Sequence, residues 1–370
     1  MKALTFLLKP VSSACNMGCD YCFYADVSAR RALPCAPRMT EPFLREMLGR
    51  IRLSLSDGDA VSFVFQGGEP TLAGLDFYRR FFEITGEWER WLRISYAFRT
   101  NGLLLDEEWC ALLKRRNLLT GLSLDLPRTA HDAIRTDPAG AGTYGRVLHA
   151  MNLLKRRGLA FNVLSTLTSE AAAQPQAVWR AVRALEIPYI QFTPCLGPLD
   201  APEYARHRLS PEGFAAFYKA VFRLWARELG SPNLCSVKLF DDLIDLLATG
   251  RTVACGLDGR CRPQLVVEAD GSVYPCDFYC TDEFRSGNIL TDPLDALLRA
   301  PSAAERLHVA LPSLCGACAY QKLCGGGCPR MLGEMYMRGD SYCGYADFLD
   351  EALPTLTGIA AALCRRLRPC

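Results

Sequence analysis

Three closely spaced cysteines stand directly after a short apolar run near the N-terminus. They are Cys15, Cys19 and Cys22, in the segment CNMGCDYC. A structural zinc ion, or a four-iron cluster held only by protein, takes four protein ligands. A cluster on this loop would therefore have one iron without a protein donor, and that iron could bind and reduce a small ligand.

Eight more cysteines gather in the last third of the chain, which is enough for two complete four-cysteine sites. Their C-x-x-C spacings suit zinc ribbons as well as iron–sulfur clusters, so spacing alone leaves both metals open. The three-cysteine loop favours iron, because zinc on three thiolates has no obvious role there. The eight are Cys255, Cys261, Cys276, Cys315, Cys318, Cys324, Cys328 and Cys343.

The composition is that of an ordinary folded protein of about two domains, with 370 residues, 50% of them hydrophobic and 22% charged. The net charge of +2 is spread along the chain and gives no footprint for nucleic acid or an anionic membrane. The N-terminal apolar run is broken by Lys9 and Pro10, which makes it too short for a secretory signal, and no stretch is long enough to cross a membrane. We therefore expect a cytoplasmic protein whose clustered cysteines bind metal rather than form disulfides.

The first 195 residues alternate short β-branched or aromatic runs with amphipathic helical patterns. Six strand-then-helix units imply a parallel sheet with right-handed helical crossovers, and such sheets bind ligands at the carboxyl ends of their strands. The three-cysteine loop follows the first strand, on that face. Strands are predicted over 3–8, 60–65, 93–100, 119–125, 159–167 and 189–193, and helices over 41–55, 75–86, 107–116, 143–156 and 175–185.

A Pro- and Gly-bearing stretch, PCLGPLDAPEY, ends this pattern, and helices predicted over 211–228 and 239–247 lead to a second region. From about Cys255 the chain is short of long apolar helices and rich in Cys and Gly, so we expect bound metal to hold this region together in place of a hydrophobic core. Asp270-Gly271 predicts a hairpin turn. The predicted boundary puts one domain with its bridging helix at 1–235, and the cysteine-rich domain with a C-terminal helix at 236–370.

The cysteine loop has the C-x3-C-x2-C pattern of the radical S-adenosylmethionine (SAM) superfamily, and FQGGEP at 65–70 resembles its GGE motif, whose backbone holds the SAM amino group. The cysteine pattern of 255–343 resembles the SPASM extension, which binds two auxiliary clusters. The segments LLKPVSSACNMGCDYCFY, FQGGEPTLAGLDFY, RTNG, GLSLD, CGLDGRC and VVEADGSVYPCDFY resemble the anaerobic sulfatase-maturating enzymes, almost from end to end. This resemblance implies an α/β fold, with a partial (β/α)6 TIM-like radical SAM barrel followed by a SPASM domain.

The resemblance also implies three [4Fe-4S] clusters, one of which binds SAM at its open iron through the SAM amino and carboxylate groups. Contacts to the amino group are implied for Gly67, Gly68 and Glu69, and contacts to the carboxylate for Ser123 and Arg135. Glu69 could instead cap a helix, and Arg135 could be a surface cation. One auxiliary cluster is implied on Cys255, Cys261, Cys276 and Cys328, and the other on Cys315, Cys318, Cys324 and Cys343.

The implied reaction oxidises a Cys or Ser side chain, in the C/S-x-P/A-x-R motif of a sulfatase polypeptide, to Cα-formylglycine. SAM cleavage would give a 5′-deoxyadenosyl radical that removes a hydrogen atom from the β-carbon. Asp277 would take the thiol or hydroxyl proton, an auxiliary cluster would accept the leftover electron, and a flavodoxin- or ferredoxin-type protein is the expected electron donor. Tyr24, beside the cofactor, and Gln66 and Gln191 match positions that line the substrate pocket, although each could equally be a packing residue.

Two other functions stay open on the sequence. A radical SAM/SPASM maturase that forms thioether or carbon–carbon crosslinks in a ribosomal precursor peptide would share the clusters, whereas a zinc-binding interaction module would share only the thiols. The chain departs from the family pattern at Leu126, where Gly is usual, and at Cys280, an extra thiol four residues after Cys276. Both Cys-type and Ser-type sulfatases fit the sequence as substrates.

The thiol count predicts three four-iron clusters after anaerobic reconstitution, or about twelve irons per chain. Replacing Cys15, Cys19 and Cys22 together with Ala should remove about four irons and all SAM cleavage, because only this loop leaves an iron open. Iron and acid-labile sulfide analysis, together with a SAM cleavage assay, measures both effects. About four irons in the unaltered protein, or zinc in place of iron, contradicts the prediction.

Overall fold

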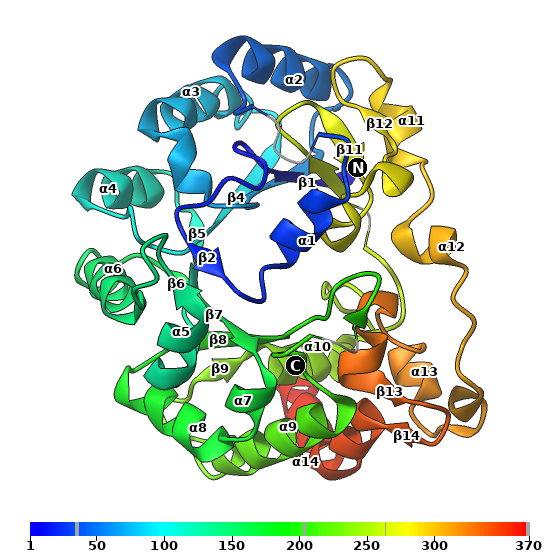
Figure 1. Ribbon diagram of the computed structural model, residues 1–370. Helices are drawn as coiled ribbons and strands as arrows, with labels where there is room; N and C mark the ends of the chain where they lie inside the picture. The colour runs from blue at the N-terminus through cyan, green and yellow to red at the C-terminus, as the bar shows by residue number, and fades with distance from the viewer. Residues whose placement is uncertain (34–36, 203–204, 263, 368–370) are drawn as a thin grey trace. The chain divides into compact units, whose positions relative to one another are not determined.

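The computed structural model describes residues 1–33, 37–202, 205–262 and 264–367 of the chain, which forms two compact units (Figure 1). Unit 1 comprises Met1–Ser123, Ile134–Phe161 and Pro263–Leu307. Unit 2 comprises Leu124–Ala133, Asn162–Arg262 and His308–Cys370. Each unit draws on distant parts of the chain, and the expected boundary between residues 235 and 236 stays a prediction.

Unit 1 is a sheet with helices along it. Its strands are β1 (Ala3–Leu8), β2 (Gly18–Cys19), β3 (Ala60–Phe65), β4 (Arg93–Thr100), β5 (Leu119–Ser123), β6 (Arg135–Thr136), β10 (Leu265–Val267), β11 (Ser272–Tyr274) and β12 (Gly287–Asn288). Its helices are α1 (Phe23–Ala29), α2 (Glu41–Leu53), α3 (Leu75–Gly86), α4 (Glu107–Arg115), α6 (Tyr144–Arg156), α11 (Leu294–Leu298) and α12 (Ala303–Leu307). In the main sheet the strand order is β12-β11-β10-β1-β3-β4-β5, and β1, β3, β4 and β5 run parallel. β2 and β6 form a separate two-stranded sheet.

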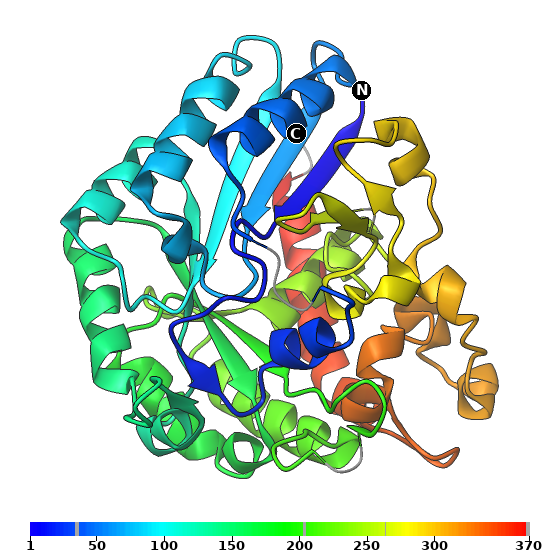
Figure 2. The ribbon, with the colours of Figure 1, turned by 45° about the horizontal axis from the view of Figure 1, so that its top comes forward.

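Aromatic side chains fill the space between this sheet and the helices, which Figure 2 shows as blue and cyan coils beside the strands of the same colours. Phe6, Phe63 and Tyr96 face one another across three neighbouring strands, with ring centroids 5.6 and 6.2 Å apart. Phe65 is fully buried and meets Tyr78 of α3 edge to face at 5.0 Å. Burial of these rings stabilises the sheet and fixes the positions of the strand ends.

Polar residues stand at the carboxyl ends of the parallel strands. Lys9 follows β1, Gln66 follows β3, Asn101 follows β4 and Ser123 ends β5. Carboxyl ends of parallel strands meet at one edge of a sheet, where ligands bind in open α/β folds. The loop that carries Cys15 leaves β1 at this edge, as the sequence predicted.

A hairpin from much later in the chain extends the sheet beside β1. β10 pairs parallel with β1, with Leu265 opposite Phe6, and β11 pairs antiparallel with β10. The turn is Asp270-Gly271, and Gly271 has φ +85°, a conformation that glycine adopts without strain. The predicted hairpin is therefore confirmed, and its pairing brings Glu268 close to the end of β1.

Unit 2 has a parallel set of strands, β7 (Phe161–Leu167), β8 (Tyr189–Pro194) and β9 (Ser236–Val237), in the order β7-β8-β9. A short antiparallel pair, β13 (Met337–Arg338) and β14 (Tyr342–Cys343), lies in the cysteine-rich segment. The helices of this unit are α5 (Arg128–Ile134), α7 (Ser169–Ala172), α8 (Pro175–Ala184), α9 (Pro211–Ala226), α10 (Lys238–Thr249), α13 (Gln321–Cys324) and α14 (Gly344–Leu367).

The expectation that the region after Cys255 lacks a hydrophobic core is wrong for its last part. α14 is 24 residues long and packs against α9 and α10. Its Phe348 is fully buried and lies 5.6 Å from the ring of Tyr218 and 6.0 Å from that of Phe240. The apolar face of this helix finds its partners in α9 and α10, which precede the cysteine-rich segment, so a search for helices within the segment alone underestimates the core.

The predicted strands and helices of the first 195 residues are confirmed with small shifts at their ends. α3 spans the predicted 75–86, α2 ends two residues early at Leu53, and β7 begins two residues late at Phe161. These patterns suffice because each element buries one regular face. Within the parts of the chain that the structure describes, none of the helices is long and apolar enough to span a membrane.

Candidate active site

The GGE segment holds the cysteine loop by its backbone. The Gly68 N–H donates to the carbonyl oxygen of Ser12 at 2.8 Å, and the Glu69 N–H donates to that of Ala14 at 2.8 Å. A Cβ on Gly68 would lie 2.0 Å from the Ala14 oxygen, and Gly67 has φ +118°, so both positions require glycine. The glycines thus allow the two backbones to touch immediately before Cys15.

The other two cysteines of the loop are fixed by secondary structure. Cys19 lies on β2, which pairs antiparallel with β6 and sets Cys19 opposite Arg135. Cys22 is the residue before the first turn of α1, and its N–H donates to the Cys19 carbonyl at 3.0 Å. The guanidinium of Arg135 lies over the ring of Tyr21 at 5.4 Å. Arg135 is thereby brought to the cysteine loop, as its expected contact with SAM requires.

Glu69 is buried, with 1% of its surface exposed, and its carboxylate accepts four hydrogen bonds. The donors are the N–H and hydroxyl of Thr71, the hydroxyl of Thr100 and the N–H of Asn101, at 2.6–3.0 Å. Burial raises the pKa of Glu69, and these donors oppose the rise. The Glu69 side chain therefore caps the following helix, which was the alternative role. The expected contact with the SAM amino group would use the backbone of Glu69.

Asn101 is a site residue that sequence reasoning did not single out, although it lies in the RTNG segment. Its side-chain amide donates to Asn16 Oδ1 at 2.8 Å and lies 3.8 Å from the sulfur of Cys15. Its backbone N–H binds Glu69. Asn101 therefore links the end of β4 to both the GGE segment and the cysteine loop. Ser123 ends β5, half-buried, one of the positions expected to bind the SAM carboxylate.

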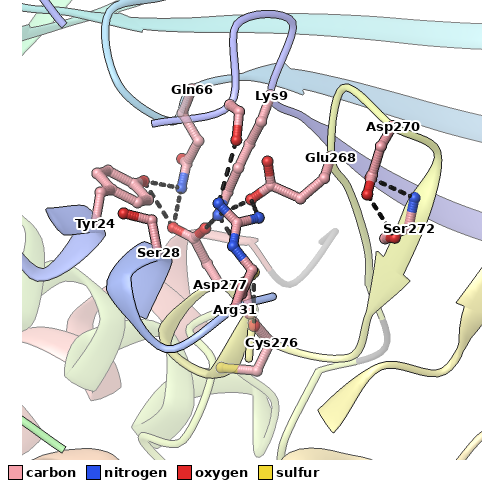
Figure 3. A network of polar contacts seen from close by, with 12 residues as sticks. Lys9, Tyr24, Ser28, Arg31, Gln66, Glu268, Asp270, Ser272, Cys276 and Asp277 are labelled. Atoms are coloured by element: carbon pink, nitrogen blue, oxygen red, sulfur yellow. Dashed lines mark hydrogen bonds and ion pairs between the residues drawn. The ribbon is translucent and has the colours of Figure 1, made fainter. Parts of the chain in front are cut away.

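Asp277 lies in a network of polar side chains, shown in Figure 3. It begins a short 3-10 helix, Asp277–Tyr279, and only 7% of its surface is exposed. Its Oδ2 accepts hydrogen bonds from the Tyr24 hydroxyl, at 2.7 Å, and from the Gln66 amide. Its Oδ1 forms an ion pair with the Lys9 ammonium at 2.9 Å. The structure thus brings together three residues that the sequence named, Asp277, Tyr24 and Gln66.

Lys9 is the hub of a buried ion cluster, since 2% of its side chain is exposed. Its ammonium pairs with Glu268 at 3.1 Å as well as with Asp277, and Glu268 pairs with Arg31 at 2.8 Å. Burial by itself lowers the pKa of Lys9, but Asp277, Cys280 and Glu268 together raise it well above its ordinary value. For Glu268, the charges of Lys9 and Arg31 outweigh burial and lower the pKa.

Neither Lys9 nor Glu268 was predicted as a site residue. Lys9 drew notice only because it breaks the apolar run that follows Met1, and a lysine that ends a buried strand is a signal of a buried partner. Glu268 directly follows β10, the first strand of the predicted hairpin, and its local sequence does not set it apart as a site residue. Lys9 is more than 250 residues from both Glu268 and Asp277 in the sequence, so only the pairing of β1 with β10 reveals the cluster.

Four of the predicted auxiliary ligands line one hollow in unit 2. They are Cys315, Cys318, Cys324 and Cys343. Burial raises the pKa of Cys324, and the neighbouring thiols of this group add to the rise, which indicates how close they are. A four-iron cluster occupies space between its thiolates, whereas zinc binds sulfur about 2.3 Å from one point. The surrounding of a shared hollow by four thiols therefore fits the predicted cluster.

The other auxiliary set is divided between the two units. Cys255, Cys261 and Cys328 belong to unit 2 and Cys276 to unit 1, so their assignment to one cluster stays a prediction. Within unit 2, a Cβ on Gly256 would lie 2.6 Å from Cys328 Cβ, which puts the Cys255 segment against Cys328. Gln191 on β8 also belongs to unit 2, and its expected place in the substrate pocket stays a prediction.

Two family models match the chain, the radical SAM superfamily over residues 10–169 and the SPASM iron–sulfur cluster-binding domain over residues 248–319. The cysteine-type anaerobic sulfatase-maturating enzyme of Clostridium perfringens (strain 13 / Type A) is 36% identical over 369 residues, which cover 97% of this chain and 99% of that protein. The chain belongs to the anaerobic sulfatase-maturating enzymes. A serine-type enzyme of the family, from Klebsiella aerogenes, is 28% identical over 94% of this chain and 86% of its own length.

The solved structure of native anSMEcpe with bound AdoMet and Cp18Cys peptide matches with a TM-score of 0.87 and 33% identity, over 98% of this chain and 99% of that one. Membership of the anaerobic sulfatase-maturating enzymes confirms the predicted radical SAM and SPASM fold, the iron–sulfur and SAM cofactors, and an enzyme that acts on a peptide in sulfatase maturation. The alternative of a precursor-peptide crosslinking maturase is not favoured, because the relatives matched over nearly their whole length mature sulfatases.

The close approach of Gly68 to Ala14 predicts a selective loss of the cluster on Cys15, Cys19 and Cys22. Gly68→Ala should lower the iron content by about four and abolish SAM cleavage, because the added carbon meets backbone that cannot rotate away. Gly145→Ala is the matched control, since nothing lies within 4 Å of its added carbon. Iron analysis and 5′-deoxyadenosine formation measure both variants, and unchanged values for Gly68→Ala would rule out a need for this contact.

Cys280 is predicted to be no ligand of any cluster. Its thiol is fully buried, with the Lys9 ammonium 3.2 Å from its sulfur, and burial raises the pKa of Cys280 to about 12. The eight cysteines of the two predicted auxiliary sets already complete two four-thiol sites, so a ninth thiol has no iron to bind. Cys280→Ser should therefore keep its full iron content by iron and sulfide analysis, whereas a loss of about four irons would show that the ligands are paired differently.

Proposed function

We propose that Asp277 is the base that removes the thiol proton from a cysteine in the C-x-P-x-R motif of a sulfatase, which the enzyme oxidises to Cα-formylglycine. The observation that carries this role is the buried carboxylate of Asp277, held between the Lys9 ammonium and the Tyr24–Gln66 pair. A carboxylate accepts both hydrogen bonds and protons, and the ion pair with Lys9 fixes the position of this one. Asp277 can therefore act as the acceptor of the substrate proton.

The chemistry requires such a base. Oxidation converts the substrate –CH2–SH to –CH=S by loss of a hydrogen atom from carbon, a proton from sulfur and one further electron. Water then gives the aldehyde and hydrogen sulfide. When bound, SAM and its cluster supply the radical that takes the hydrogen atom. The proton is left to the protein, and general-base catalysis typically contributes about 10²–10⁴-fold.

The neighbours of Asp277 have separate tasks in this proposal. The Lys9 ammonium holds one carboxylate oxygen of Asp277 in place, and Glu268 pairs with the same ammonium. Tyr24 and Gln66 donate to the other oxygen, and the Gln66 amide also donates to the Tyr24 hydroxyl at 2.8 Å. The side-chain oxygen of Gln66, Oε1, is buried without a hydrogen-bond partner among the described residues. It is available to accept an N–H of the substrate peptide.

A cysteine substrate is favoured by the comparisons. The cysteine-type relative is 36% identical, whereas the serine-type relative is 28% identical, and both are aligned over most of the chain. Asp277 could take a proton from a serine hydroxyl as well as from a cysteine thiol. The proposed preference for cysteine therefore rests on similarity to the cysteine-type relative. A peptide pair that differs only in Cys or Ser at the first motif position tests it directly.

Cys255, Cys261, Cys276 and Cys328 would hold an auxiliary cluster in this proposal, and such a cluster would supply an acceptor for the electron taken from the substrate. A second cluster on Cys315, Cys318, Cys324 and Cys343 accompanies it, in line with the shared hollow. A flavodoxin- or ferredoxin-type protein would supply the electron that cleaves SAM. We place the reaction in the cytoplasm, where thiols stay reduced and can bind iron.

Replacing Asp277 by Asn removes the base and keeps nearly the same shape. Asp277→Asn should retain all the iron and still form 5′-deoxyadenosine, but yield less formylglycine by roughly 10²-fold or more. The assay is anaerobic incubation with SAM, a reductant and a C-x-P-x-R peptide, followed by mass analysis. Asp270→Asn is the matched control, because Asp270 lies on the same hairpin and, among the described residues, its carboxylate accepts hydrogen bonds only from the N–H and hydroxyl of Ser272 in its own turn.

The outcomes of this experiment separate chemistry from structure. A near-normal formylglycine yield in Asp277→Asn would refute the base assignment. Loss of iron would point instead to a structural role of Asp277 in the turn after Cys276. In that case the Lys9→Met variant distinguishes the base role from the structural role. That variant removes the cation without touching the hairpin sequence, and the proposal predicts that it also lowers formylglycine yield while SAM cleavage continues.

A further inference from the structure

We propose that Arg99 is a specificity-determining residue, whose guanidinium binds an acidic side chain close to the target cysteine of the sulfatase peptide. This inference rests on the proposed function and adds to it a preference among cysteine-containing substrates. All the residues that carry it belong to unit 1.

Arg99 stands beside the network of the candidate base. Phe65, the last residue of β3, is paired with Leu8 of β1 and with Phe98 of β4. The residues that follow these three therefore form a row across the ends of the strands, in the order Lys9, Gln66 and Arg99. Neighbouring strands lie about 4.8 Å apart. Arg99 is thus one strand away from Gln66, and Gln66 belongs to that network (Figure 3).

Arg99 and Gln66 also project from the same face of the sheet. Side chains alternate between the two faces along a strand. The Ser62 and Ser95 hydroxyls lie 2.7 Å apart across β3 and β4, and so they share a face. Gln66 and Arg99 each lie an even number of positions further along their strands, on that face. Arg99 is exposed there, whereas Phe98 is fully buried on the opposite face.

The charge of Arg99 has no counterpart in the described parts of the chain. The cluster around Lys9 is balanced in itself, because its two cations form ion pairs at 2.8–3.1 Å with its two carboxylates. The four residues of that cluster are Lys9, Arg31, Glu268 and Asp277. No carboxylate among the described residues forms an ion pair with Arg99. A positive charge is therefore left over on the face that holds the candidate base.

The guanidinium of Arg99 is suited to a carboxylate ligand. Its parallel N–H groups can donate to both oxygens of a carboxylate at once. The residue paired with Arg99 on β5 is Gly121, which places no side chain against it. In the proposed reaction the sulfatase peptide is the molecule that lies at Asp277. An Asp or Glu of that peptide is therefore the ligand that we assign to Arg99.

The distance along the row limits where the acidic residue stands in the peptide. The target cysteine lies at Asp277 in the proposed reaction, and Gln66 separates Asp277 from Arg99 by about one strand spacing, roughly 5 Å. An extended peptide advances about 3.3 Å per residue. The acidic residue is therefore within about two positions of the cysteine, either directly after it or at one of the two positions before it.

The test measures binding of C-x-P-x-R peptides that carry Glu or Gln at each of these positions in turn. The reconstituted, SAM-bound enzyme should bind one Glu peptide about threefold to tenfold more tightly than its Gln counterpart. Arg99→Gln should remove this difference, and Arg99→Glu should reverse it in favour of Lys at the same position. Anaerobic isothermal titration calorimetry measures peptide and SAM affinity. Arg93→Gln is the matched control, because Arg93 is exposed on the same face of β4 but near its opposite end.

Each outcome decides the proposal. Equal binding of the Glu and Gln peptides at every position overturns it, and so does a preference for Glu that survives in Arg99→Gln. Weaker SAM binding in Arg99→Gln with an unchanged peptide preference would assign Arg99 to the SAM carboxylate, which also overturns it. If Arg99→Gln loses iron, Arg99→Lys is measured instead, and it should keep the preference because it keeps the charge. Peptide binding requires no turnover, so failure of the formylglycine assay would count against the proposed function alone.

Discussion

The buried pairing of Lys9 with Glu268 and Asp277 is the interaction on which the site of unit 1 depends. It joins the end of the first strand to a hairpin more than 250 residues later, in a place where water cannot take over from a lost partner. Removing one member of such a cluster leaves a buried charge unpaired, which costs several kcal/mol in typical cases. The cluster thereby constrains the hairpin register, because a shift of β10 by one residue would turn Glu268 away from Lys9. The register of this hairpin in turn fixes the position of Asp277.

Close backbone contact plays the corresponding part for the cysteine loop. Gly67 and Gly68 let the end of β3 touch the chain that leaves β1, and Asn101 and Glu69 connect the same point to the end of β4. Three strand ends are thus tied to one loop by hydrogen bonds that a side chain at either glycine would prevent. The aromatic layer between the sheet and α3 holds those strand ends at fixed spacing, since its rings are fully buried and interlocked. The geometry of the site therefore depends on the packing of the core.

The two groups of auxiliary cysteines differ both in sequence spacing and in how far the structure supports them. Cys315, Cys318, Cys324 and Cys343 lie within 29 residues of one another and line one hollow in unit 2. Cys255, Cys261 and Cys328 also belong to unit 2, whereas Cys276 belongs to unit 1. The fold therefore supports the first set as one site, and the second set stays a prediction.

The sequence by itself determined the strand and helix pattern, the three-cysteine loop, the glycine motif and the hairpin at Asp270-Gly271, because each is written in local periodicity or in residues with special backbone freedom. It also led to Asp277, Tyr24 and Gln66, through resemblance. The sequence did not indicate Lys9, Glu268 or Asn101, since each is an ordinary polar residue until its distant partner is known. The core contributed by α14 was missed for the same reason, as its partners α9 and α10 precede the cysteine-rich segment. Only the tertiary structure decides which buried charges meet and which remain uncompensated, because electrostatic energy depends on distance in space and on burial, and neither is a property of neighbours in the chain.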